Sequence, residues 1–268
     1  MKQIVPQDNW PESWKLSHQY DRLEIHGNER KSGYSYAWQN RRRHTLALIN
    51  KVARPGEKIL DVAAAQGNFS LTLAELGYEV TWNDLREDLS GYVEAKREHG
   101  IVHYAPGNIF DMDFHESFDL VLIAEIIEHV AHPDAFLQKI AALVKPGGYI
   151  VMTSPNGEYF RNSLPKFSNC PDVSSFEDLQ FKPDGDGHIF LFHLDEIHEL
   201  SARASLSVRE IRLFTNPLTA GHMKLDAALK HLPKAAIETI EHLSSSLPLP
   251  LSKKLHTAAA VLLQRSQG

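Results

Sequence analysis

Short apolar runs alternate with amphipathic segments through the middle of this chain. Buried strands are predicted from the apolar runs, at 58–62, 79–82, 101–104, 118–123 and 149–153. Helices are predicted from the segments between them, at 68–76, 86–98 and 135–144. Glycines or a Pro-Gly-Gly turn follow these helices as stop signals. Strands that alternate with helices over short connections predict an α/β fold, with a parallel sheet covered by helices on both faces.

The two flanks of this region show a weaker pattern. Residues 1–33 are polar with scattered aromatic side chains, and a helix is predicted at 35–53. After the fifth strand we expect a helix at 194–204, a strand at 207–214, two helices within 216–250 and a last strand at 256–264. The predicted organisation is an N-terminal helical extension or lid over 1–40 and one main domain over 41–268, with a small helical insertion at 216–250.

Composition and charge narrow the class of protein. The 268 residues carry ordinary globular proportions of hydrophobic (43%) and charged (23%) side chains. The single cysteine, Cys170, excludes an internal disulfide framework. A net charge of −6 argues against a broad nucleic-acid surface. No apolar run reaches the roughly 20 residues of a membrane span, and the start lacks the apolar core of a signal peptide, so we expect a cytoplasmic protein.

The loop after the first strand has the character of a ligand-binding loop. It reads Asp61-Val62-Ala63-Ala64-Ala65-Gln66-Gly67-Asn68-Phe69-Ser70. Small residues let a ligand approach the backbone, and the helix that follows offers free N–H groups. Only one glycine lies between Asp61 and Leu76, so the Gly-x-Gly-x-x-Gly fingerprint of dinucleotide binding is absent. A tight strand–helix turn without a ligand is the alternative.

Polar residues also follow the second and third strands. Asp84 comes 23 residues after Asp61, where an acid can accept hydrogen bonds from ribose hydroxyls. The same aspartate could also cap the helix predicted from Arg86, and one residue can serve both roles. Asn108 and Ile109 follow the third strand, although a Gly-Asn pair is also typical of an ordinary turn.

The stretch from Phe118 to Val130 is the most specific in the chain. It reads Phe-Asp-Leu-Val-Leu-Ile-Ala-Glu-Ile-Ile-Glu-His-Val and is followed, after a helix, by Val-Lys-Pro-Gly-Gly. With the loop at 61–70, this pairing resembles the class I S-adenosylmethionine-dependent methyltransferases, and most closely the ubiquinone-biosynthesis O-methyltransferases. The match runs from about residue 43 to 155. Ala63 and Ala65 stand where that family usually has glycine, and alanine disfavours positive φ.

The resemblance implies a fold, a cofactor and a set of cofactor-binding residues. The fold is a doubly wound, Rossmann-like sheet of seven mostly parallel strands with the last strand antiparallel. The cofactor is S-adenosylmethionine, with S-adenosylhomocysteine as product. Arg43, 18 residues before Asp61, corresponds to an arginine that holds the cofactor's carboxylate, unless it lies on a solvated helix face. The remaining cofactor-binding residues are Asp61, Ala63, Ala65, Gly67, Asn68, Phe69, Asp84, Leu85, Asn108, Ile109 and Glu125.

The acidic and histidine residues after the fourth strand allow three interpretations. In the first, His129 is a general base, since histidine exchanges protons near neutral pH, and Glu128 and His188 assist it. In the second, these residues and Glu125 hold a divalent metal ion, because the small-RNA 3′-terminal 2′-O-methyltransferases are similar in Glu-x-x-Glu-His and in a later histidine. In the third, they support the strand–helix junction. A metal is possible but not favoured.

The sequence is therefore consistent with three functions. The first is methylation of a hydroxyl on a small-molecule substrate. The second is metal-dependent 2′-O-methylation of RNA or another sugar hydroxyl, although a nucleic-acid partner is disfavoured by the charge. The third is a catalytically silent binding or scaffold protein on the same fold. The acceptor, the pathway and the oligomeric state are left open, because fold alone does not decide them.

Overall fold

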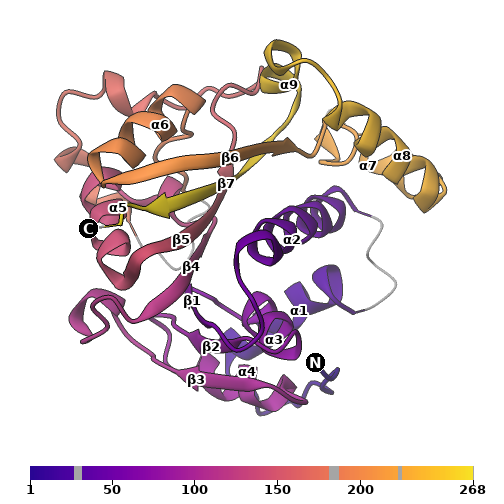
Figure 1. The fold of residues 1–268 in the computed structure, drawn as a ribbon. Helices are drawn as coiled ribbons and strands as arrows, with labels where there is room; N and C mark the ends of the chain where they lie inside the picture. The colour runs from indigo at the N-terminus through magenta and orange to yellow at the C-terminus, as the bar shows by residue number, and fades with distance from the viewer. Residues whose placement is uncertain (27–31, 181–186, 223–224, 268) are drawn as a thin grey trace.

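A seven-stranded sheet runs through the molecule in the order β3-β2-β1-β4-β5-β7-β6 (Figure 1). The computed structural model describes residues 1–26, 32–180, 187–222 and 225–267. The strands are β1 (Lys58–Val62), β2 (Glu79–Trp82), β3 (Ile101–Tyr104), β4 (Phe118–Ala124), β5 (Val144–Pro155), β6 (Leu206–Phe214) and β7 (Ala258–Arg265). Strands β1 to β5 pair in parallel, and β7 is antiparallel to both β5 and β6. The predicted doubly wound, mostly parallel sheet is confirmed.

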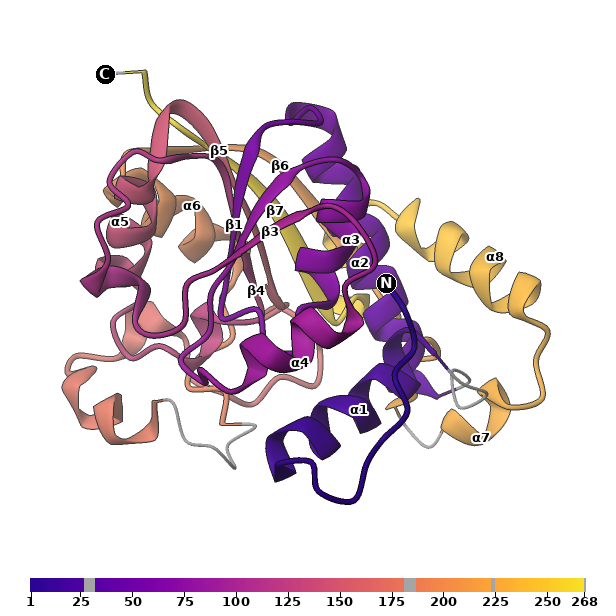
Figure 2. The same cartoon turned by 90° about the horizontal axis from the view of Figure 1, so that it is seen from below.

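Helices cover both faces of this sheet. Helices α5 (Pro133–Leu143) and α6 (Leu194–Arg203) lie on one face, and α2 (Gly33–Val52) and α3 (Asn68–Glu75) lie on the other (Figure 1). Helix α4 (Leu89–Lys96) connects β2 to β3 and lies beside α1 (Glu12–Glu24), as Figure 2 shows. The helix predicted at 86–98 is therefore shorter at both ends. The main-domain helices bury apolar side chains in two cores, one on each face of the sheet.

Strand β4 shows why the apolar runs are continuous rather than alternating. Leu120 and Leu122 point into the core beneath α2 and α3, whereas Val121 and Ile123 point into the core beneath α5 and α6. All four side chains are fully buried. Successive residues of a strand face opposite sides, so a central strand covered on both sides needs an apolar residue at every position.

The strand order reverses between β1 and β4. From β1 the chain builds outward through β2 to β3, and it then returns to place β4 on the other side of β1. The loops that leave β1 and β4 therefore diverge toward opposite faces and leave a crevice at the carboxyl ends of these strands, which is where open α/β sheets bind ligands. The loop at 61–70 leaves β1 at this crevice, and the stretch 118–130 runs through β4 and past its end there.

The terminal regions add helices to the sheet. Helix α1, with 13 residues, confirms the predicted N-terminal helical extension. Helix α2 begins at Gly33 and continues through residue 40, where we placed the end of the extension. Between β6 and β7 the described chain forms α7 (Asp226–Leu229), α8 (Lys234–Ser245) and α9 (Leu249–Leu255), one helix more than predicted. No helix in the described ranges is long and apolar enough to cross a bilayer.

Candidate active site

The loop after β1 has the backbone of a glycine loop in spite of its alanines. Ala63, Ala65 and Gly67 all have positive φ, of 49°, 48° and 70°. The loop is pinned to the end of β2, because the Ala64 N–H donates to the Asn83 carbonyl oxygen at 2.8 Å. The left-handed region costs an alanine roughly 1–2 kcal/mol, so the surrounding structure holds this shape against its local preference.

Substitution of these alanines tests the strain. We expect Ala63→Gly and Ala65→Gly each to raise the free energy of unfolding by about 0–1 kcal/mol, because relief of the left-handed backbone outweighs the greater chain entropy of glycine. The matched control is Ala47→Gly inside α2, which should lower it by about 1 kcal/mol. Urea denaturation followed by circular dichroism measures both. Equal losses in loop and helix would contradict the strained conformation.

Two cavities adjoin at this loop and share Val62 and Ala63 in their walls. The larger holds about 500 Å³ between the ends of β2, β3 and β4, and its wall is mostly apolar. The smaller holds about 100 Å³ over the loop itself. The predicted residues that line the larger cavity are Ala63, Leu85, Asn108 and Ile109. Those that line the smaller are Asp61, Ala63, Ala65, Asn68 and Phe69. Gly67, Asp84, Arg43 and Glu125 are not among the lining residues of either.

Asp84 lies at the expected end of β2, but its carboxylate is already occupied. One oxygen accepts hydrogen bonds from the backbone N–H and Nε of Arg86, both at 2.9 Å. The other accepts from the Ala65 N–H at 2.9 Å and from Arg86 Nη2 at 3.1 Å. Helix α4 begins only at Leu89, so Asp84 does not cap it. A ribose could reach this carboxylate only after the half-exposed Arg86 side chain moves away.

Helix α2 presents Arg41 to the smaller cavity rather than Arg43. Arg41 lines that cavity and pairs with Glu125, Nη2 to Oε2, at 3.0 Å. Arg43 donates to the Asn40 side chain outside this lining. Two positions along a helix differ by about 200° around its axis, so these side chains leave on nearly opposite sides. Helical spacing could have indicated Arg41 rather than Arg43. Arg41 lies three residues after Trp38 and four before Thr45, and both of these are buried.

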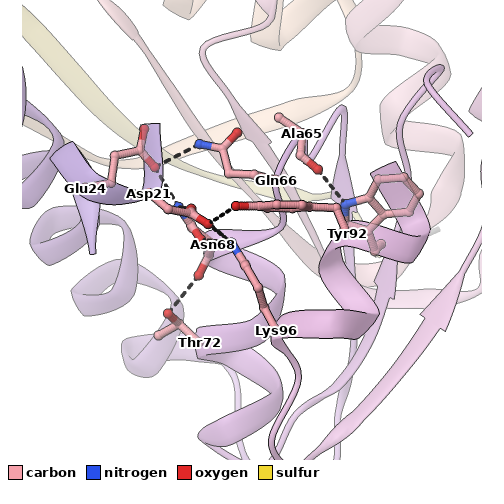
Figure 3. Close-up of polar contacts among 9 residues, drawn as sticks. Asp21, Glu24, Ala65, Gln66, Asn68, Thr72, Tyr92 and Lys96 are labelled. Atoms are coloured by element: carbon pink, nitrogen blue, oxygen red, sulfur yellow. Dashed lines mark hydrogen bonds and ion pairs between the residues drawn. The ribbon is translucent and has the colours of Figure 1, made fainter. Parts of the chain in front are cut away.

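An acid on α1 also reaches the smaller cavity, and sequence reasoning missed it. Glu24 lines the cavity and is almost fully buried. Its carboxylate accepts hydrogen bonds from Tyr34 Oη at 2.6 Å, Gln66 Nε2 at 2.9 Å and Asn68 Nδ2 at 2.7 Å. Figure 3 shows Glu24 beside Gln66 and Asn68 of the loop. Burial raises the pKa of Glu24, and these hydrogen bonds oppose that rise.

A buried ion pair fixes α1 against the loop (Figure 3). Lys96 Nζ donates to both Asp21 carboxylate oxygens, at 2.9 and 2.8 Å, and to Asn68 Oδ1 at 2.7 Å. Asn68 Nδ2 and Tyr92 Oη donate to the same aspartate, at 2.8 and 2.7 Å. Asn68 is the first residue of α3, so the helix that follows the loop is tied to α1 by charge-assisted hydrogen bonds.

Asp61 is buried near the end of β1 and lines the smaller cavity. Its side chain accepts a hydrogen bond from Ser70 Oγ at 2.6 Å. Burial raises the pKa of Asp61 to about 7, although the Ser70 hydroxyl favours the charged form. The carboxyl is thus committed to the loop's own helix.

A carboxylate and two imidazoles meet beyond the end of β4. Ligand atoms of Glu128, His129 and His188 all lie within 4.8 Å of one another. Glu128 and His129 belong to the 3₁₀ turn η2 (Ile127–His129), and His188 comes close because the Ile189 N–H donates to the Glu128 carbonyl oxygen at 2.7 Å. Three of the four residues considered for a metal site therefore cluster, whereas Glu125 turns toward Arg41.

Glu128 is the unusual member of this cluster. Its side chain is fully buried, and neither carboxylate oxygen has a hydrogen-bond partner among the described residues. Burial, and then the charge of Glu125, raises the pKa of Glu128 well above its ordinary value. A buried carboxyl without partners is costly unless it is protonated or meets a cation. One carboxylate with two imidazoles is a ligand set that divalent transition metals and zinc accept.

Sequence comparison places residues 35–211 in the family described as methyltransferase domain. Over 135 residues the chain is 33% identical to a ubiquinone biosynthesis O-methyltransferase of Xanthomonas campestris pv. campestris (strain B100), which covers 43% of this chain and 55% of that protein. The chain thus spans about half the length of the curated relatives that it matches. Helix α1, with Asp21 and Glu24, lies outside the matched region.

Comparison with solved structures finds the same fold. An S-adenosylmethionine-dependent methyltransferase from Mesorhizobium loti superposes with a TM-score of 0.56 at 16% identity, covering 86% of this chain and 98% of that one. The Haemonchus contortus phosphoethanolamine N-methyltransferase 2, solved in complex with S-adenosyl-L-methionine, superposes with a TM-score of 0.56 at 16% identity. The match covers 95% of this chain and 56% of that one. Likeness at this level establishes architecture and leaves the acceptor undecided.

Proposed function

This chain belongs to the methyltransferase domain family, and we propose that it transfers the methyl group of S-adenosylmethionine to a hydroxyl group of a small molecule. Its membership confirms the resemblance to class I S-adenosylmethionine-dependent methyltransferases. The observation that carries the proposal is the pair of joined cavities at the point where strand order reverses.

The residues of the two cavities fit the two ends of that cofactor. The larger cavity has apolar walls that include Ile109 and Phe110, together with the polar side chains Asn83 and Asn108, and this combination suits adenine. The smaller is lined by the charged residues Glu24, Arg41 and Asp61, and it suits a zwitterionic amino acid. Arg41 takes the role that the sequence assigned to Arg43, because a guanidinium binds a carboxylate through paired hydrogen bonds.

The chemistry divides between cofactor and protein. When bound, the cofactor supplies a methyl group on a positively charged sulfur that a nucleophile displaces. The protein orients the hydroxyl and excludes water, and an imidazole nitrogen of His129 accepts the hydroxyl proton. A carboxyl oxygen of Glu128 lies within 4.8 Å of an imidazole nitrogen of His129, and its ionised form would stabilise the imidazolium. The ubiquinone biosynthesis relatives support an oxygen acceptor.

A second candidate is metal-assisted methylation of a sugar hydroxyl, including the 2′-hydroxyl of RNA. The partnerless buried carboxylate of Glu128 beside two imidazoles favours it. A divalent ion held there would lower the pKa of an acceptor hydroxyl, and Glu128, His129 and His188 would hold the ion. The net charge of −6 weighs against a large RNA surface and leaves a short sugar substrate as the better fit.

Calorimetry with the cofactor and its product tests the proposal. We expect micromolar binding of S-adenosylmethionine and S-adenosylhomocysteine, and release of S-adenosylhomocysteine with at least one acceptor from a panel of phenols, catechols, sugars and short RNA. Turnover that survives EDTA would overturn the metal candidate, and turnover restored only by added Mg²⁺ or Mn²⁺ would favour it. Binding without turnover on any acceptor would favour a silent binding protein. No binding would overturn cofactor use.

A further inference from the structure

The smaller cavity carries two opposite charges on its walls, and both come from helices that precede β1. Glu24 is on α1 and Arg41 is on α2. They lie near enough for the charge of Arg41 to lower the pKa of Glu24. The other acid of this wall, Asp61, accepts a hydrogen bond from Ser70 of the loop's own helix at 2.6 Å, so Glu24 is the acid that comes from outside the loop. The cavity thus offers one cation and two acids to the amino-acid end of a ligand.

Glu24 is held in place and retains capacity for another donor. Its Oε2 accepts from the side-chain amides of Gln66 and Asn68, while among the residues that the structure describes Oε1 accepts from the Tyr34 hydroxyl alone. A carboxylate oxygen can accept about two hydrogen bonds, so one position on Oε1 is left. The buried Asp21–Lys96 pair keeps α1, and with it Glu24, over the loop.

We propose that Glu24 binds the α-ammonium group of S-adenosylmethionine, so that α1 completes the cofactor site from outside the region that matches the family. This assignment rests on the proposed function. Arg41 binds the carboxylate of the same amino-acid end, and Glu24 accepts a hydrogen bond from its ammonium. Gln66 and Asn68 position Glu24, and Asp21 and Lys96 position α1. A hydrogen bond to a charged group is worth about 1.5–3 kcal/mol, which corresponds to roughly 10–100-fold in affinity.

A cycle of two ligands and two proteins tests the assignment. The ligands are S-adenosylhomocysteine and its deaminated analogue, in which hydrogen replaces the α-amino group. We expect the wild-type protein to bind the analogue about 10–100-fold more weakly. Glu24→Gln should weaken S-adenosylhomocysteine by a similar factor and leave the analogue within about twofold, because both changes remove one interaction. Isothermal titration measures all four affinities.

Two control variants separate binding from folding. Arg41→Met should weaken both ligands alike, because both keep the carboxylate. Glu12→Gln, at an exposed position of α1, should change neither. Equal loss for both ligands in Glu24→Gln would overturn the assignment, and so would equal binding of the two ligands by the wild-type protein, a comparison that needs no variant. Wild-type protein that binds neither ligand would instead overturn the proposed function, and the assignment with it.

Discussion

Replacing His129 with alanine is expected to reduce turnover by about 10²–10⁴-fold while the affinity for S-adenosylhomocysteine stays within about twofold. His129 lies beyond the end of β4 with Glu128 and His188, and none of the three is in the wall of either cofactor cavity. On the proposed function, its loss therefore removes the proton acceptor and leaves the two cavities intact. Release of S-adenosylhomocysteine with the best acceptor of the panel measures turnover, and titration calorimetry measures affinity.

The dependence on metal identifies what His129 does. If it is the base, divalent ions do not restore turnover to His129→Ala. If it is a metal ligand, excess Mg²⁺ or Mn²⁺ restores part of the turnover. His103→Ala is the control, because His103 is exposed on β3 and, within the described ranges, pairs with Glu79 alone. A fully active His129→Ala variant would return this residue to a structural role.

The second large effect is expected from Asp21→Ala, which should lower the free energy of unfolding by about 3–5 kcal/mol. The substitution leaves the Lys96 ammonium buried without its counter-charge, and it also removes the acceptor used by Asn68 and Tyr92. A surplus buried charge costs far more than the net contribution of the intact pair, because desolvation is then unopposed. Urea denaturation followed by circular dichroism gives the change.

An exposed ion pair provides the matched control. Glu199 pairs with Arg203 one turn along α6, and both side chains are more than half exposed, so Glu199→Ala should cost less than about 0.5 kcal/mol. Asp21→Ala should also weaken S-adenosylhomocysteine, since α1 would no longer hold Glu24 over the loop. A loss of stability for Asp21→Ala as small as that of the control would contradict the view that this pair anchors α1.

Most of the sheet was predictable because its signals are local. Strands β1 and β4 are buried on both faces, so each reads as a continuous apolar run whatever its neighbours are. Element boundaries were predicted less well. Helix α4 begins at Leu89 instead of Arg86, because the residues before it close as i→i+3 turns, with the Leu89 N–H donating to the Arg86 carbonyl oxygen and the Ser90 N–H to that of Glu87. Strand β5 begins at Val144, inside the predicted helix, because Val144 pairs with Phe118.

By itself the sequence determined the fold class, the loop after β1 and the acid–histidine stretch after β4, since each is written in consecutive residues. Only the tertiary structure decided that Arg41 rather than Arg43 faces the smaller cavity. It also decided that the Arg86 side chain donates to the Asp84 carboxylate, and that Glu24 reaches the loop from α1. Local periodicity states which face of an element is buried, but not which distant element covers it. The element that covers each face depends on how helices 40 or more residues apart in the sequence pack together. The contacts of Glu24 with Asn68 and of Asp21 with Lys96 are of this kind.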